Sequence, residues 1–168
     1  MSNGLQQYLI AHRGNINGPN PERENHPDYV TESISAGYDA EIDVWLIDGQ
    51  WSLGHDGPLW PVDIRFLRNL FFWCHTKNLE AFHGLLSFGA NCFWHEEDKF
   101  TMTSFGYIWT YPGEKLTTKS ICVMPEKGVD EATTRLSYGF CSDHLVKLEE
   151  ILRNGGDVKN AFDKYEIR

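Results

Sequence analysis

The chain has 168 residues, of which 41% are hydrophobic and 23% charged, a composition typical of an ordinary globular protein with a sizeable core. We therefore expect one domain, spanning residues 1–168. The formal net charge of -9 argues against nucleic acid or an anionic membrane surface as the main partner, because both are bound through clustered Lys and Arg.

Eight runs of apolar, aromatic or β-branched residues that end in polar residues predict strands. Their apolar stretches are continuous rather than alternating, which is typical of strands covered on both faces. Three other segments carry apolar residues at helical spacing, and two of them stop at glycine. In chain order, we expect a strand in 8–14, a helix in 26–39, strands in 40–47, 50–57 and 71–78, a helix in 78–91, strands in 92–98, 107–114, 120–126 and 138–144, and a helix in 142–156.

The alternation of strands and helices favours parallel β/α units, whose polar strand ends carry the chemistry in such folds. We therefore predict an α/β fold, a compact TIM-type (β/α) barrel. A full barrel needs roughly 250 residues, and the segments before 107 and before 120 have no room for a crossover helix. Either some helices are replaced by loops or the barrel is incomplete. An open doubly wound sheet is the alternative, but no G-x-G-x-x-G follows a strand.

Two carboxylates, Glu41 and Asp43, stand two residues apart in the apolar run "AEIDVWLI". In a strand they point to the same face, where they repel each other and are costly to bury without a positive charge between them. A hard divalent cation bound through oxygens would resolve this cost, and Mg²⁺ or Ca²⁺ suits carboxylate ligands. The alternative is that both lie at a strand end and pair with Lys or Arg.

Two histidines stand where strands are expected to end. His12 and Arg13, in "AHRG", precede Gly14, and His55 and Asp56 follow a strand in "LGHDG". An acid, a base and a fixed positive charge are what phosphoryl chemistry requires. These residues therefore favour a phosphate-handling site.

The motifs "AHRG", "EN" at Glu24, "EIDV" and "GHDG", in this order, resemble the glycerophosphodiester phosphodiesterase family of the phosphatidylinositol phospholipase C-like barrels. The similarity covers roughly the first third of the chain. It implies a β/α barrel, one divalent metal ion and hydrolysis of a small phosphodiester. On the matching residues, it implies an acid–base pair of His12 and His55, phosphate contact by Arg13, a place for Glu24 in the substrate site, and metal ligation by Glu41 and Asp43.

The chain departs from the family pattern at two places. Arg23 replaces the family's usual Pro before Glu24, and His75 stands where a third metal-binding Glu is expected, two residues before Lys77. His75 remains a candidate metal ligand and Lys77 a candidate phosphate contact, since both face one side of the strand. Alternatively, His75 is a packed residue without such a role. An imidazole in place of a carboxylate favours a different ion, so Mn²⁺ stands beside Mg²⁺ and Ca²⁺.

Further along the chain the pattern is weaker. Trp109 is expected to stack on the substrate, with a place in the core as the alternative. His95 or Glu96 could reach the site from "FWHEED", although clustered acids are typical of a solvated loop. Asp143 is a candidate at the rim of the last strand.

The four cysteines have no C-x-x-C pair and lie in apolar runs, so we expect buried free thiols in a reducing, cytoplasmic compartment. No stretch approaches a membrane span and nothing marks the N-terminus for export. The expected partner is a small phosphodiester, with a homodimer as an open question. Besides a phosphodiester hydrolase, we consider a catalytically inactive phosphodiester-binding protein, a phosphodiester lyase, and a metal-dependent barrel enzyme of other chemistry.

Overall fold

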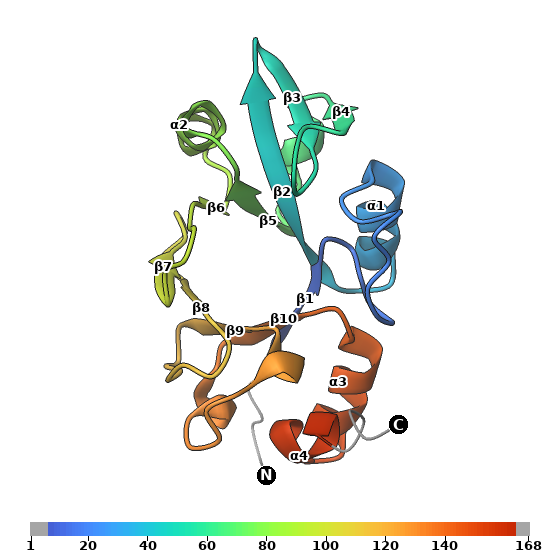
Figure 1. The fold of residues 1–168 in the computed structure, drawn as a ribbon, viewed down its shortest axis with the longest axis vertical. Coiled ribbons are helices and arrows are strands. Elements are labelled where there is room, and N and C mark those ends of the chain that lie inside the picture. Colours follow the sequence, from blue (N-terminus) through green and yellow to red (C-terminus); the bar gives the residue numbers. More distant parts are fainter. Residues whose placement is uncertain (1–6, 164–168) are drawn as a thin grey trace.

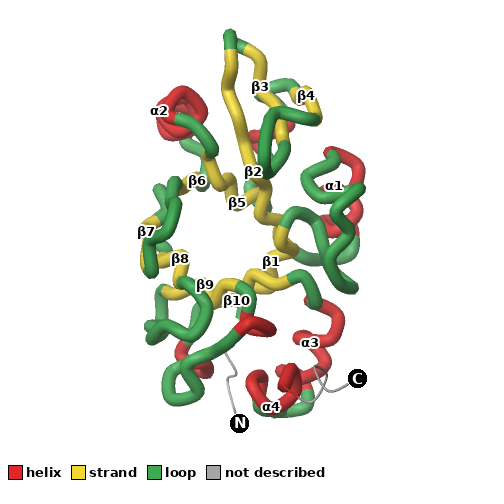
Figure 2. Tube along the Cα trace, viewed as in Figure 1, coloured by secondary structure: helices red, strands yellow, loops and turns green. Residues whose placement is uncertain are grey.

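Ten strands form one curled, mixed sheet in the computed structural model, which describes residues 7–163 (Figures 1 and 2). The strands are β1 (Tyr8–His12), β2 (Asp39–Ile47), β3 (Gln50–Leu53), β4 (Trp60–Val62), β5 (Phe72–Thr76), β6 (Cys92–Phe93), β7 (Phe100–Met102), β8 (Ile108–Thr110), β9 (Ser120–Val123) and β10 (Gly139–Ser142).

Seven of the strands are parallel, in the order β6-β5-β2-β1-β10-β9-β8. The first half of β2 lies between β1 and β5. Its second half extends past the end of β1 and pairs with the antiparallel strand β3, which leads to β4. At the other edge β7 pairs antiparallel with β8. Within residues 7–163, β6 pairs with β5 alone, so the curl is an open half-barrel.

The described part of the chain has four short α-helices: α1 (Pro27–Ser35), α2 (Leu79–Phe88), α3 (Leu145–Arg153) and α4 (Val158–Asp163). Local signals explain the ends of α2, because the Asn78 side chain accepts a hydrogen bond from the Ala81 N–H and Gly89 ends the helix at a φ of 74°. None of the helices described for this chain is long and apolar enough to cross a membrane.

The predicted TIM-type barrel is wrong. The eight expected strands and three expected helices are present, but β4, β7 and α4 were not expected. Three strand pairings are antiparallel, and the links from β8 to β9 and from β9 to β10 contain only loops and the 3₁₀ turns Pro125–Lys127 and Thr134–Leu136. Hydrophobic periodicity identifies the strands, but it does not show how a loop connects them. The strand-rich sheet therefore lacks the ring of helices that a TIM-type barrel needs.

Apolar side chains fill both faces of the central strands, as their continuous apolar runs indicate. Helices α1 and α2 pack on the outside of β2, and α3 packs on β1 and β10. The side chains that point into the curl form what we call the inner cluster, whose buried members are Ile10, Trp73, Phe93, Trp109, Ile121 and Cys141.

The four cysteines are buried free thiols, as predicted, and burial raises the pKa of each, that of Cys122 to about 12. Their compartment remains a prediction. Cys74 and Cys92 occupy paired positions on β5 and β6.

Candidate active site

Polar side chains follow the inner cluster along the same strands, towards the C-terminal end of each strand. Because side chains alternate along a strand, each lies two residues after an inward-facing residue. His12 follows Ile10 on β1, His75 follows Trp73 on β5, and Asp143 follows Cys141 at the end of β10. This alternation explains why carboxylates occur in a buried strand: Glu41 and Asp43 face the inside of the curl.

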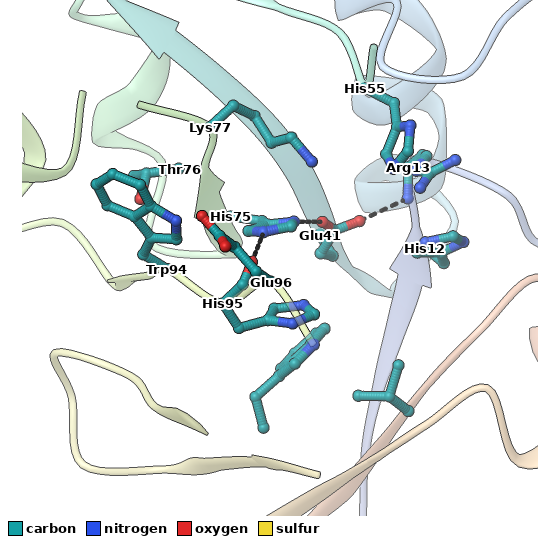
Figure 3. A pocket seen from close by; sticks show the side chains of 12 residues that line it. His12, Arg13, Glu41, His55, His75, Thr76, Lys77, Trp94, His95 and Glu96 are labelled. Atoms are coloured by element: carbon teal, nitrogen blue, oxygen red, sulfur yellow. Dashed lines mark hydrogen bonds and ion pairs between the residues drawn. The ribbon is translucent and has the colours of Figure 1, made fainter. Parts of the chain in front are cut away.

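His12, Glu41 and His75 open onto a cavity of about 410 Å³ (Figure 3). Seven of the nine predicted site residues line it, together with side chains from the segment after β6. The full lining is His12, Arg13, Glu41, His55, His75, Thr76, Lys77, Trp94, His95, Glu96, Trp109 and Val123. Among the predicted residues, only Asp43 and Glu24 lie behind the cavity wall.

A sharp turn after β1 places Arg13 in the site. Arg13 has a φ of 53° and Gly14 a φ of 89°, and a Cβ at Gly14 would lie 2.9 Å from the Tyr29 ring. The turn directs the backbone N–H of Arg13 to Glu41 Oε2, at 3.1 Å. Its guanidinium reaches Glu24 Oε2 at 3.1 Å. Glu24 therefore supports Arg13 from behind the cavity wall.

His12 is held by Asp143. Its Nδ1 lies 2.8 Å from Asp143 Oδ1, which also accepts a hydrogen bond from Asn15 Nδ2 at 2.8 Å. Glu126 fixes Asp143 in turn by accepting from its backbone N–H. Burial lowers the pKa of His12, but the Asp143 hydrogen bond and the nearby charge of Glu41 outweigh it, so this pKa is raised. Nε2 is the ring nitrogen of His12 that Asp143 leaves for a ligand.

His55 reaches the cavity from the loop after β3. Because β3 runs back along β2, its end returns to the level of the carboxylates, where Gly54 N–H donates to the Asp43 carbonyl. Gly54 has a φ of 146°, and a Cβ there would lie 2.1 Å from the Gly57 carbonyl oxygen, so the loop requires glycine. His55 is half-exposed, and its Nδ1 lies 2.6 Å from Asp56 Oδ1.

Asp43 is fully buried beneath the cavity. Arg13 Nε lies 3.1 Å from its Oδ2, and Lys77 Nζ lies 3.6 Å from its Oδ1. Asn25 donates to Oδ2 at 2.9 Å. Burial would raise the pKa of Asp43, but His75 and then the charges of Arg13 and Lys77 hold it below its ordinary value.

Glu41 behaves in the opposite way, because burial and then the neighbouring charge of Asp43 raise its pKa. The two carboxylates therefore differ in how readily they ionise. A bound cation would favour the ionised form of both.

Glu41, Asp43 and His75 form a group that could hold a metal ion, with one ligand atom from each lying within 4.8 Å of the others. His75 Nδ1 is 3.0 Å from Asp43 Oδ1 and 3.9 Å from Glu41 Oε1. Asp43 Oδ1 is buried and accepts no hydrogen bond from any described residue. A buried carboxylate oxygen without a donor fits a cation, so the residues present suit a metal ligand set.

The sequence indicates His95 only as a residue that could reach the site, and the structure places it in the cavity lining. Its ring stacks on that of His75 at a centroid distance of 4.6 Å, and its carbonyl oxygen lies 3.2 Å from His75 Nε2. Burial, then the neighbouring side chains of His75 and Lys77, lower the pKa of His95 to about 4. Its position two residues after the inward-facing Phe93 was the available signal.

Trp109 lies both at the cavity, where it was expected to stack on the substrate, and in the core, which was the alternative. It lines the cavity, yet it is only 5% exposed and packs against Phe93 at a ring-centroid distance of 4.5 Å. It therefore forms part of the cavity floor.

Comparisons of the chain with protein-family models, with curated proteins and with solved structures gave no match. The case for a function therefore depends on the site itself.

Proposed function

We propose that the chain is a metal-dependent hydrolase of a small phosphodiester, related to the glycerophosphodiester phosphodiesterases. One observation carries the proposal: two histidines, two cationic side chains and a three-residue metal ligand set line or adjoin a single cavity. The sequence motifs that resemble the family contribute most of these residues. The resemblance concerns the order of these residues along the chain, whereas the cavity concerns their arrangement in space.

Arg13 and Lys77 would neutralise the charge of the bound phosphate. Both lie beside Asp43, which holds their charged ends at the base of the cavity. Fixed positive charge in a partly buried site stabilises the additional negative charge that develops as the phosphorus–oxygen bond breaks.

Glu41, Asp43 and His75 would hold one divalent ion, Mg²⁺, Ca²⁺ or Mn²⁺, which would act as a Lewis acid on a phosphate oxygen. The remaining chemistry belongs to His12 and His55. One takes a proton from the nucleophile, either water or a hydroxyl of the substrate, and the other gives a proton to the leaving alcohol. Asp143 and Asp56 each bind Nδ1 of one histidine, which leaves both Nε2 atoms for these transfers.

The test is hydrolysis of bis(p-nitrophenyl) phosphate after chelation and after addition of Mg²⁺, Mn²⁺ or Ca²⁺. We expect activity that returns with a metal and is lost in His12→Ala and Glu41→Ala. His83→Ala is the control, since His83 is exposed on α2 and does not line the cavity. Absence of metal-dependent hydrolysis in the wild type would contradict the proposal.

A second substrate separates the two proton transfers. An alkyl phosphodiester of glycerol has a poor leaving group that needs protonation, whereas p-nitrophenolate leaves without it. The variant of the acid histidine should therefore lose much more activity on the alkyl diester. Phosphorus NMR of the product distinguishes a hydrolase from a lyase, which would stop at a cyclic phosphate.

A catalytically inactive phosphodiester-binding protein is the second candidate. It is favoured by the 3.0 Å approach of His75 Nδ1 to Asp43, because a protonated His75 would neutralise this carboxylate without a metal. Binding of a phosphodiester in the presence of chelator, with no turnover under any metal condition, would support this alternative.

A further inference from the structure

We infer that the metal site takes a borderline divalent ion, such as Mn²⁺, Co²⁺ or Zn²⁺, in preference to Mg²⁺ or Ca²⁺, with Nδ1 of His75 as a direct ligand. The inference rests on the proposed function only for the presence of a metal. It assigns the chemical class of the ion and the ligand atom that selects it.

The hydrogen bonding of His75 fixes which ring nitrogen is free. Nε2 lies 3.2 Å from the carbonyl oxygen of His95, and a carbonyl can only accept, so Nε2 carries the hydrogen. In the neutral ring Nδ1 then has the lone pair. A metal-binding histidine usually donates its other N–H to a carbonyl or carboxylate in this way.

The free nitrogen faces two carboxylate oxygens rather than a donor. Nδ1 is 3.0 Å from Asp43 Oδ1 and 3.9 Å from Glu41 Oε1. A lone pair beside carboxylate oxygens is repulsive unless a cation lies between them. The buried Asp43 Oδ1 has no well-aligned hydrogen-bond donor among the described residues, so a cation shared with Nδ1 would complete its contacts.

The spacing of these atoms favours a small ion. Ligand bonds of about 2.1 Å at a right angle place neighbouring donor atoms about 3 Å apart, whereas the longer bonds of Ca²⁺ place them at roughly 3.3 to 3.7 Å. The 3.0 Å separation of His75 Nδ1 and Asp43 Oδ1 matches the shorter bonds, while Glu41 Oε1, 3.9 Å from Nδ1, would move closer to bind any of these ions. Calcium is therefore the least suitable of the ions considered.

The donor type then disfavours Mg²⁺, which binds oxygen ligands, while imidazole suits Zn²⁺ and other first-row ions. Charge acts in the same direction. With a neutral His75 the ligand set carries two negative charges, and the side chains of Arg13 and Lys77 already lie beside Asp43. The low net negative charge weakens the binding of a hard ion, which depends on ligand charge, more than that of an ion that also gains from a nitrogen donor.

Isothermal titration of the chelator-treated full chain with Mn²⁺, Co²⁺, Zn²⁺, Mg²⁺ and Ca²⁺ tests the selectivity. We expect Mn²⁺ to bind at least about tenfold more tightly than Mg²⁺ or Ca²⁺, and His75→Glu to reduce this ratio at least about tenfold by restoring an oxygen ligand. His83→Ala is the matched control and should leave the ratio unchanged. Equal binding of Mg²⁺ or Ca²⁺, an unchanged ratio in His75→Glu, or no binding of any ion would overturn the inference.

Pulsed electron paramagnetic resonance of the Mn²⁺-loaded wild type needs no variant and remains informative if His75→Glu does not fold. A directly bound imidazole nitrogen should give a coupling that changes when the protein is made with ¹⁵N-histidine, and its absence would refute ligation by His75. Nitrogen-ligated Mn²⁺ without phosphodiester hydrolysis would refute the proposed function and leave this inference standing. Hydrolysis supported best by Mg²⁺, with no nitrogen coupling, would sink this inference alone.

Discussion

The Asp143→Asn variant tests whether the carboxylate behind His12 contributes to its chemistry. Asn has nearly the same shape as Asp, so the variant removes the charge while keeping the packing of a side chain that is only 8% exposed. The His12 side chain is 17% exposed, so solvent screens the pair only weakly. A hydrogen bond to a charged group contributes about 1.5–3 kcal/mol, which corresponds to a roughly 10- to 150-fold loss of kcat/KM if it supports the transition state.

The direction of the pH dependence identifies the role of His12. Asp143 helps to raise the pKa of His12, so the variant should lower it. A base must be deprotonated, and if His12 is the base, the acidic limb of the kcat/KM profile moves to lower pH. An acid must be protonated, and if His12 is the acid, the alkaline limb moves to lower pH.

Stability gives a second measure of the same pair in chelated protein. Because the folded-state pKa of His12 is raised, its stabilising contribution is complete below its ordinary value of 6.5 and is lost as the pH rises through the folded-state value. The lowered pKa of Asp143 contributes above its ordinary value of 3.8. The difference in melting temperature between wild type and Asp143→Asn should therefore be larger at pH 5.5 than at pH 8.5.

Asp56→Asn is the control for this prediction. Asp56 makes the corresponding contact to His55, but its side chain is 96% exposed, so water screens the interaction. We expect less than about a fivefold change in kcat/KM. The reasoning is refuted if neither limb moves in Asp143→Asn, or if the two variants lose activity equally.

Three further predictions concern the scaffold. Gly54→Ala should lose activity and about 1–3 kcal/mol of stability, because Gly54 has a positive φ. Gly57→Ala in the same loop is the control: an added Cβ there has nothing within 4 Å, so activity and urea unfolding should match the wild type. Leu85→Ala should lower the free energy of unfolding in urea by about 2–5 kcal/mol, because this side chain is fully buried. Leu86→Ala, at its half-exposed neighbour, should lower it by less than about 1 kcal/mol. Equal losses would contradict the assigned packing of α2. The four buried thiols should react with Ellman's reagent only after denaturation, and fast labelling of the native chain would contradict their burial.

The sequence predicted the strands well because each is a continuous apolar run that ends in polar residues. The runs at 71–78 and 138–144, for example, contain β5 and β10. Strand β4 was missed because Trp60–Val62 includes a proline, which weakens any strand pattern, and β7 because Phe100–Met102 directly follows a run of charged residues that favours a loop. The fold class failed at the connections, where the absence of helices depends on how loops pack.

The grouping of the candidate residues around one cavity follows from the sequence more directly than the fold does, because these residues lie at strand ends and share the period-two alternation. That rule brings together His12, Glu41 and His75. It could not reveal the contact of Glu24 with Arg13 behind the cavity, because this contact depends on the turn at Gly14 and a loop conformation. The hydrogen bond between His12 and Asp143 joins residues 131 positions apart in the chain, and no local sequence pattern specifies such a pairing.

Helices cover only one side of the half-barrel, and this explains how the site could be present without a complete ring of helices. The charged and histidine side chains of the cavity come from β1, β2, β5 and the segments after β3 and β6, and helices α1, α2 and α3 pack on these core strands from outside. Strands β8 and β9 contribute only Trp109 and Val123 to the lining. The chemistry therefore needs rigid support on one side of the curl, while the other side supplies an apolar wall. A loop can hold such a wall, because packing an apolar surface demands less positional accuracy than aligning proton donors, acceptors and metal ligands.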